Sequence, residues 1–450
     1  MNDLQTAAPP ARGTDLLALV DVALREAKAR GAAQAEAAVS LDVGLSVAVR
    51  LGEVETVEYQ RDRGMGVTVY FGTRKGAAST ADLSEDALRE TVAKACSIAR
   101  FTAEDPCAGL ADPDMLATDI PDLDLSHPWA ALTPEAAVEL ARACESAALA
   151  VDKRITNSDG AGVSSHSGVR AYGNSHGFMA AYPGSLHGIS CAVIGVEGEE
   201  MQRDYWYSST RDWRDLESAE SIGRRSGERA VARLGARKLA TTRAPVLYTP
   251  EVARGLIGHF TGAIRGGSQY RRASFLLDAA GQQVFPDWFE LYERPHLRKA
   301  LGSAPFDNEG VATRDRDLVT NGVLEGYVLS TYSARKLGLR TTGNAGGTHN
   351  LIVRGRERDF DGMLALLGRG LLVTELMGQG VNGVTGDYSR GAAGFWVEGG
   401  RIAYPVHEIT IAGNLKDLYR HIVDIGNDVD QRGGTRTGSI LIEEMTIAGD

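Results

Sequence analysis

The sequence predicts an α+β protein with two unlike parts: an N-terminal α/β part with a strand meander, and a C-terminal mostly-β domain carrying one long helix. Three observations support this fold class. Helical and strand-like apolar patterns alternate in the first half, and the second half has few helical patterns. The 53 glycines indicate many tight turns between short strands. A length of 450 residues suggests about two to four domains.

The first folded unit is expected over residues 14–115, after a disordered lead of residues 1–13. Thr14 is an N-cap candidate, and the spacing of apolar residues behind it predicts a helix to about Arg30. Leu45, Val47 and Val49 alternate with small or polar residues, as in a half-buried strand. Three strands and a second helix complete this α+β domain, at about 35–50, 54–62, 65–72 and 84–101.

A middle domain is expected over residues 125–236. Thr133 and Pro134 form a good helix start, and the helix should run to about Ala150. An antiparallel meander at about 153–209 and a polar helix at about 213–236 follow. Gly173-Asn-Ser-His-Gly177 matches a serine-hydrolase nucleophile elbow. A strand pattern rather than a helix comes next, so we predict a hairpin with Asn174 and Ser175 at its tip.

The third unit, residues 243–450, is expected to be mainly β with one helix at 250–264. Val252, Leu256, Ile257 and Phe260 of that helix fall at helical spacing. Farther on, the run from Gly378 to Gly383 has the glycine spacing of a dinucleotide-binding loop. The residues behind it are too rich in glycine for the helix that such a loop requires, so no nucleotide site is expected.

Composition excludes several function classes. A net charge of −11 and a pI of about 5.4 argue against nonspecific nucleic-acid binding, which needs a basic surface. No signal-peptide pattern and no apolar run of about 18 residues is present, so neither secretion nor a membrane span is expected. The cysteines have no metal-knuckle spacing and are expected to be reduced and buried; they are Cys96, Cys107, Cys144 and Cys191.

The helix at 250–264 resembles a metal-binding helix that has lost its chemistry. Zinc hydrolysis needs two or three His, Cys or carboxylate ligands, and usually a carboxylate base. His259 could serve as one ligand, but Arg254 is a cation and Gly255 has no side chain. We therefore expect no metal site in this chain. His259 is expected to be a buried histidine that is hydrogen-bonded to a backbone carbonyl.

The remaining histidines and acidic residues that we considered are expected to have structural or solvent-exposed positions rather than catalytic roles. Three histidines of the meander are expected to be surface or turn residues: His166, His176 and His187. His407 and Glu408 are neighbours on a predicted strand and should point to opposite faces unless a bulge intervenes. Three acidic residues near the C-terminus are expected on a solvated turn: Asp424, Asp428 and Asp430.

Several separate segments of the sequence together carry a resemblance to a known family, because they follow one another in the same order as in that family. They include the runs 252–259, 266–268, 274–278, 305–310, 332–338, 378–389 and 405–415, and the terminal Ile447-Ala-Gly449. With these, the chain resembles the TldD/PmbA family of modulator-of-DNA-gyrase metallopeptidases, and specifically its PmbA (TldE) branch. The resemblance is strong over about residues 245–450 and rests on general layout in the first half.

The resemblance implies a division of labour. The family's catalytic branch has a His-Glu-three-residues-His helix and a later cysteine ligand. On this chain the second histidine falls on His259, the first on Arg254 and the glutamate on Gly255, and no cysteine follows Cys191. The resemblance thus implies a non-catalytic subunit of a cytoplasmic heterodimer. Zinc is expected in the TldD-type partner, and the substrates would be unfolded or short peptides.

Glycine-rich loops are our candidates for holding a peptide backbone, because glycine permits close approach. These candidates are Gly346, Gly347, Gly378, Gly380 and Asn382. A bulky residue at Gly346 or Gly380 is expected to impair cleavage without unfolding the chain. Two alternative functions stay open: an autonomous metallopeptidase using His259, and a regulatory protein binding gyrase or a toxin–antitoxin pair. A homodimer is a possible state of the isolated chain.

Overall fold

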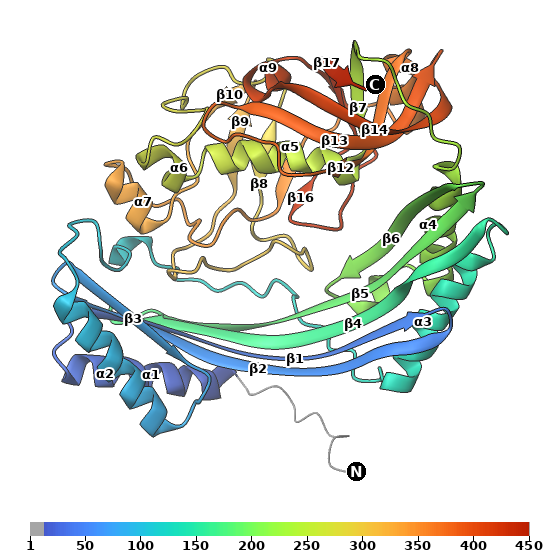
Figure 1. Cartoon of the computed structure of the whole chain (residues 1–450). Coiled ribbons are helices and arrows are strands. Elements are labelled where there is room, and N and C mark those ends of the chain that lie inside the picture. The colour runs from blue at the N-terminus through green and yellow to red at the C-terminus, as the bar shows by residue number, and fades with distance from the viewer. Residues whose placement is uncertain (1–12, 450) are drawn as a thin grey trace.

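The computed structural model describes residues 13–449, and the predicted disordered lead lies outside them apart from Gly13, which begins the first helix. The first half alternates helices and long strands (Figure 1). Its elements are α1 Gly13–Ala29, β1 Gln34–Arg50, β2 Glu53–Phe71, β3 Arg74–Thr80, α2 Glu85–Phe101, η1 Pro113–Met115, α3 Pro134–Leu149, β4 Ile155–Asn174, β5 Met179–Glu197, β6 Glu200–Thr210, η2 Trp213–Asp215 and α4 Ala219–Ala232.

All six strands of this half form one antiparallel sheet in the order β3-β2-β1-β4-β5-β6. The sheet curves around the C-terminal half, with α1 and α2 under one end and α3 and α4 at the other (Figure 1). Two predicted strands at 54–62 and 65–72 are one strand, β2, so that prediction was wrong. Gly64 and Gly66 do not interrupt it, because their pairing with β1 continues in register.

Each end of the sheet has its own core. At one end α1 and α2 bury Leu16, Val20 and Leu88 against β1 and β2. At the other end α3 and α4 cover Val47 and Trp206. The predicted polar helix at 213–236 is wrong in its bounds, because Ser218 accepts a hydrogen bond from the Ser221 backbone and starts α4 only after a short 3-10 turn.

The C-terminal half contains two further sheets and one long helix. The sheets have the orders β10-β9-β8-β11-β16 and β14-β13-β12-β7-β17-β15. The elements are β7 Thr242–Tyr248, α5 Pro250–Ala263, α6 Gly266–Tyr270, β8 Leu291–Glu293, β9 Arg316–Thr320, β10 Val323–Leu324, α7 Thr331–Lys336, β11 Leu351–Val353, α8 Phe360–Leu367, β12 Gly370–Met377, β13 Asp387–Glu398, β14 Arg401–Asn414, α9 Leu415–Arg420, β15 Ile422–Ile425, β16 Thr435–Arg436 and β17 Ile440–Ala448.

Helix α5 lies within the largest core, which takes residues from both sheets. The predicted α+β fold class is confirmed, including the strand-rich C-terminal half with its helix at 250–264. Between residues 13 and 449, no helix combines the length and the apolar character that a bilayer crossing demands.

Candidate functional site

Helix α5 is fixed in place by its apolar face. Pro250 occupies the first helical turn, where its missing N–H costs no hydrogen bond. Leu256, Ile257 and Phe260 are buried in the core. The Tyr419 hydroxyl donates a 2.8 Å hydrogen bond to the Leu256 carbonyl, which ties the helix to α9. One side of α5 is thus held rigidly, as a functional helix requires.

The other side of α5 is open. Gly255, Gly258 and Gly262 lie one turn apart, and a Cβ atom added to any of them would meet none of the described residues within 4 Å. Gly258 is exposed, and the other two are half-buried. Bare backbone is therefore accessible along about two turns of the helix.

His259 sits between these glycines and the core. Its ring is half-buried and meets Tyr388 edge-on, with centroids 6.0 Å apart. Burial, with the nearby Arg390 charge, lowers the pKa of His259, which favours the neutral imidazole. Within residues 13–449 no hydrogen bond to its ring is found, so the expected backbone-carbonyl partner is absent. The prediction failed because the neighbouring glycines leave the ring only partly enclosed.

Arg254 does not point into empty space. Its Nη2 donates a 3.0 Å hydrogen bond to the Tyr207 hydroxyl of β6, and its Nη1 lies 3.8 Å from the Asp430 carboxylate. The position that the family's first histidine would occupy therefore holds a paired, permanent cation. Among residues 13–449, no three His, Cys, Asp or Glu side chains gather in a way that could hold a metal ion. These residues do not fit a zinc site.

Arg254 belongs to a larger contact between the two halves. Arg432 lies 3.8 Å from the Trp206 ring centroid, and Arg225 lies 3.6 Å from it. At such distances the two guanidinium groups must occupy opposite ring faces. Arg432 also binds Asp430 at 2.9 Å and Glu251 of α5 at 3.3 Å. We call this group the Trp206 clamp; it consists of Trp206, Arg225, Glu251, Asp430 and Arg432.

The clamp corrects one expectation about the acidic residues. Asp430 is buried; burial alone would raise the pKa of its carboxyl, but hydrogen bonds and charge from Arg432 outweigh this and lower that pKa. Asp424 is also buried and binds Arg358 at 2.8 Å. A solvated turn was therefore the wrong prediction for these two residues. Asp424 is paired with the distant Arg358, and Asp430 is enclosed by the nearby Arg432 together with the distant Arg254.

The predicted peptide-binding glycines fall on two separate loops. Gly346 and Gly347 line a cavity of about 340 Å³ beside Arg265, at the C-terminal end of α5. Gly378, Gly380 and Asn382 lie on the loop between β12 and β13 and do not line it.

Gly380 has a packing reason to be glycine. A Cβ there would lie 2.0 Å from the Ser389 carbonyl oxygen. At Gly346 the nearest atoms belong to the exposed Asn308 side chain instead, although the backbone has a φ of +104°. A bulky residue at Gly380 would therefore distort the loop, contrary to our expectation that such a variant would test peptide binding cleanly.

Two cavities lie between the curved sheet and the C-terminal half. They measure about 650 and 430 Å³, and both are lined by Glu36 of β1 and by Glu309. Tyr172 donates a 2.8 Å hydrogen bond to Glu36, whose pKa is nevertheless raised because burial dominates. At the rim, Asp105 accepts hydrogen bonds from the Tyr332 hydroxyl and the Lys336 ammonium of α7. The space between the halves is therefore walled by acidic and tyrosine side chains.

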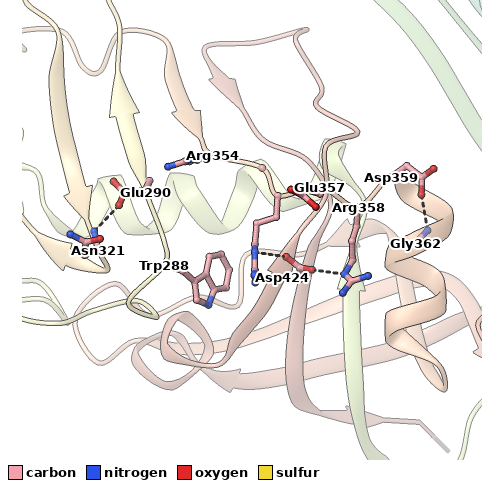
Figure 2. Close-up of a pocket in the computed structure, with 11 residues that line it drawn as sticks. Trp288, Glu290, Asn321, Arg354, Glu357, Arg358, Asp359, Gly362 and Asp424 are labelled. Carbon is pink, nitrogen blue, oxygen red and sulfur yellow. Dashed lines mark hydrogen bonds and ion pairs between the residues drawn. The ribbon is translucent and has the colours of Figure 1, made fainter.

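Another cavity, of about 1030 Å³, lies elsewhere on the C-terminal half (Figure 2). Arg354, Arg356 and Arg358 line it with Trp288 and Asp424. Asp424 pairs with two of these arginines, and Arg356 also lies 4.9 Å from the Trp288 ring centroid. None of the residues predicted to bind peptide lines this cavity, and its arginines are largely occupied by carboxylates.

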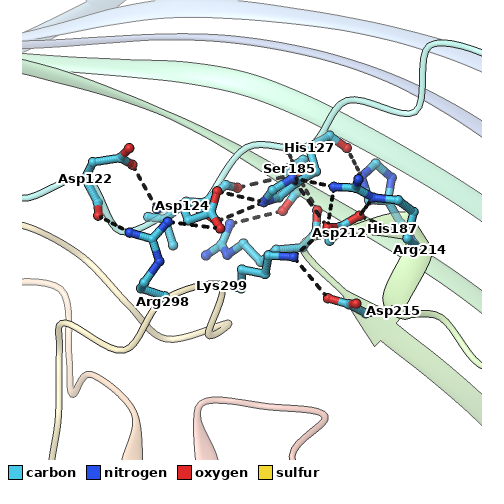
Figure 3. Close-up of polar contacts among 12 residues, drawn as sticks. Asp122, Asp124, His127, Ser185, His187, Asp212, Arg214, Asp215, Arg298 and Lys299 are labelled. Atoms are coloured by element: carbon cyan, nitrogen blue, oxygen red, sulfur yellow. Dashed lines mark hydrogen bonds and ion pairs between the residues drawn. The ribbon is translucent and has the colours of Figure 1, made fainter.

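A histidine–aspartate cluster marks a second contact between the halves (Figure 3). Asp212 is buried and binds Lys299 at 2.6 Å and Arg214 at 2.8 Å, while His127 Nδ1 lies 3.5 Å away. The hydrogen bond from Arg214 does most to hold the pKa of Asp212 well below its usual value. His187 is fully buried, contrary to the predicted surface role, because Ser165 and the His127 carbonyl satisfy both ring nitrogens. These contacts leave no free acid–base pair.

Two remaining motifs have structural explanations. The predicted hairpin is confirmed: β4 ends at Asn174, β5 begins at Met179, and Ser175 Oγ accepts a hydrogen bond from the Ala35 backbone. A bulge does occur at Glu408, which has a φ of +52°. His407 nevertheless bonds Gln202, and Glu408 pairs with Lys238, so the two do not act on each other.

Comparison with known proteins agrees with this architecture. Family models match in three consecutive parts: PmbA/TldA metallopeptidase domain 1 at 35–99, the central domain at 127–234 and the C-terminal domain at 241–449. A Metalloprotease PmbA from Escherichia coli O157:H7 is 54% identical over 92% of each chain. A Metalloprotease PmbA homolog from Haemophilus influenzae is 48% identical over 98% of this chain and 100% of that one.

Solved structures give the same result. A putative modulator of DNA gyrase from Bacteroides thetaiotaomicron aligns with a TM-score of 0.91 and 29% identity, covering 96% of this chain and 98% of that one. TldE from Thermococcus kodakarensis shares the fold, with a TM-score of 0.85, 21% identity, and coverage of 96% and 100%. The chain belongs to the PmbA/TldD metallopeptidase family, on its PmbA branch.

Proposed function

We propose that this chain is the non-catalytic subunit of a cytoplasmic TldD/TldE-type peptidase complex. A TldD-type homologue would carry the zinc and cut unfolded or short peptides. The observation that carries the proposal is the state of Arg254, whose cation pairs with Asp430 and Tyr207 at the place of a metal ligand. Gly255 supplies no base, and no cysteine follows Cys191.

The chain's contribution would be to hold substrate. The bare backbone along Gly255, Gly258 and Gly262 and the cavities between the two halves support this role. An extended peptide can be held by main-chain hydrogen bonds with little demand on its side chains. The glycine loops at Gly346–Gly347 and Gly378–Asn382 remain candidates for the same task.

Zinc content and proteolysis of the purified chain, alone and mixed with its TldD-type homologue, test the proposal. The chain alone should hold no stoichiometric zinc after incubation with zinc salt and dialysis, and it should not cut an unstructured peptide. The mixture should cut the peptide and lose activity on chelation. Gly258→Leu in this chain should slow the mixture without unfolding, since that position is open.

A second candidate is an autonomous metallopeptidase. The relatives' name, Metalloprotease PmbA, and the lowered pKa of His259 favour it, because a metal ligand must be a neutral imidazole. His259 alone supplies one ligand where about three are needed. Chelator-sensitive proteolysis by the lone chain would select this candidate.

A third candidate is a regulatory binding protein. The Bacteroides relative is described as a putative modulator of DNA gyrase. The acidic net charge of −11 disfavours direct DNA contact and leaves a protein partner. Direct binding of the purified chain to gyrase, with no effect on peptide cleavage by a TldD-type homologue, would select this function.

A further inference from the structure

The cavity beside Arg265 contains a single charged side chain. It measures about 340 Å³, within the range of roughly 300–1,000 Å³ that is typical of ligand sites. It lies where α6 and α7 meet, just beyond the C-terminal end of α5 (Figure 1). Among the residues of 13–449 that line it, Arg265 alone is charged, and none is a carboxylate. We call this space the Arg265 cavity; Gly266, Tyr270, Tyr332 and Gly347 also line it.

The Arg265 guanidinium has no partner of its own. Arg265 is exposed, and within residues 13–449 its side chain makes no ion pair, hydrogen bond or cation–π contact. The neighbouring cations of α7 differ in this respect. Arg335 binds Asp112 at 2.8 Å. Lys336 likewise binds Asp105 at 3.0 Å, so Arg265 is the cation of this region that is left to pair with an added anion.

The other polar side chains of the cavity are already occupied. The Asn344 amide nitrogen donates hydrogen bonds to the Glu293 carboxylate at 2.8 Å and to the Gly347 carbonyl at 3.1 Å. Ser330 and Ser333 cap α7, and their hydroxyl oxygens lie 3.1 Å apart. These contacts fix the walls of the cavity. The guanidinium is therefore the polar side-chain group with which a ligand could pair without breaking an existing contact.

Two glycines leave space next to the guanidinium. A Cβ atom on Gly347 would lie 3.6 Å from Arg265 Nη2, so the guanidinium rests beside bare backbone. Gly346 and Gly347 have φ values of +104° and +133°, which other residues rarely adopt. In the described part of the chain, no hydrogen bond from the Gly346 N–H is found. A ligand can thus approach Arg265 closely, and one main-chain donor near it is unused.

We propose that the Arg265 cavity binds a carboxylate of the substrate peptide, either its C-terminal carboxylate or an acidic side chain. The guanidinium would donate two parallel hydrogen bonds to the two carboxylate oxygens, a geometry that an ammonium group cannot reproduce. This role for Arg265 rests on the proposed function, in which the chain holds substrate. A cation just beyond a helix C-terminus also stabilises the helix, but a lysine would do so equally well.

Peptide binding by the isolated, full-length chain tests this role without cleavage and without a partner. Three unstructured peptides are titrated to millimolar concentration in label-free microscale thermophoresis: a free acid, its C-terminal amide, and an amide whose last residue is aspartate. The free acid should bind about tenfold more tightly than the plain amide, or better. If the aspartyl amide matches the free acid, the cavity accepts either carboxylate. If it matches the plain amide, the cavity is specific for the C-terminal carboxylate.

Variants of Arg265 separate carboxylate binding from a structural role. Arg265→Gln should raise the Kd of the free acid to that of the plain amide and leave the Kd of the amide unchanged. Arg265→Lys should keep the wild-type Tm but lose most of the preference, because it retains the charge without the planar fork. The control is Arg272→Gln, which removes an equal charge from an exposed arginine outside the cavity, 3.5 Å from Asp278. It should leave both Kd values unchanged.

Several results would overturn the carboxylate site. They are equal Kd values for the free acid and the plain amide, a preference that survives Arg265→Gln, and an equal loss in Arg272→Gln. A lysine variant with the full preference, or no binding of the free acid by the isolated chain, would overturn it as well. Failure of the mixture with a TldD-type homologue to cut peptide would instead overturn the proposed function, because the binding assay does not depend on cleavage.

Discussion

Replacing Arg432 by alanine should weaken the contact between the two halves more than replacing an exposed arginine does. The Arg432 side chain is 14% exposed and binds Asp430, which is 5% exposed. Removing one partner of such a buried pair costs about 3–5 kcal/mol. Arg254, 3.8 Å from Asp430, offsets part of this loss. The guanidinium stacked on Trp206 contributes about 1 kcal/mol more. We expect Arg432→Ala to lower the free energy of unfolding by about 3–4 kcal/mol.

Arg225→Ala is the matched control. Arg225 is exposed, stacks on the same Trp206 ring at 3.6 Å and makes no ion pair within 4 Å among the described residues. It should therefore cost only about 1 kcal/mol. Urea unfolding followed by tryptophan fluorescence measures both variants. If Arg432→Ala costs no more than Arg225→Ala, the Asp430 pair adds nothing and the account of the clamp is wrong.

Three further outcomes are expected. A hydrogen bond from the Tyr332 hydroxyl contributes most to lowering the pKa of Asp105 to about 2, followed by a backbone N–H and Lys336. The stabilising contacts of the Asp105 carboxylate are therefore complete above about pH 4 and weaken as the pH falls toward 2. The Tm difference between wild type and Asp105→Asn should shrink over that range. Gly258→Ala should raise the free energy of unfolding by up to about 1 kcal/mol, because the position is an open one within a helix. Gly380→Ala should lower the free energy of unfolding by about 1–3 kcal/mol, because its Cβ would meet the Ser389 carbonyl. Equal effects of the two substitutions in chemical denaturation would refute this packing argument. The double variant Arg254→His/Gly255→Glu restores the helix motif but should still bind no stoichiometric zinc by elemental analysis, because a third ligand is missing.

Local patterns predicted the fold well where neighbouring residues decide it. The apolar spacing in α5 and the alternation of Leu45, Val47 and Val49 in β1 placed both elements, because burial of one face selects those periods. The division of β2 into two strands was wrong, because pairing with β1 overrides the two glycines near its centre.

The candidate site was only partly predictable for the same reason. Arg254 and Gly255 could be identified as unfit for a metal from their side-chain chemistry alone. Their surroundings could not, because Tyr207 and Asp430 come from segments far apart in the chain. Burial of His187 was missed likewise, since its partners lie on β4 and on the loop before α3. Clusters held by long-range ion pairs leave no periodic pattern in the sequence.

Zinc binding by the isolated, full-length chain is the most direct test of the central claim. Isothermal titration with zinc, paired with elemental analysis, should detect no stoichiometric site, and a complex with the TldD-type homologue should contain metal only in that homologue. A single tight zinc ion in the lone chain, lost on His259→Ala, would contradict the claim that the paired Arg254 cation has replaced a metal site.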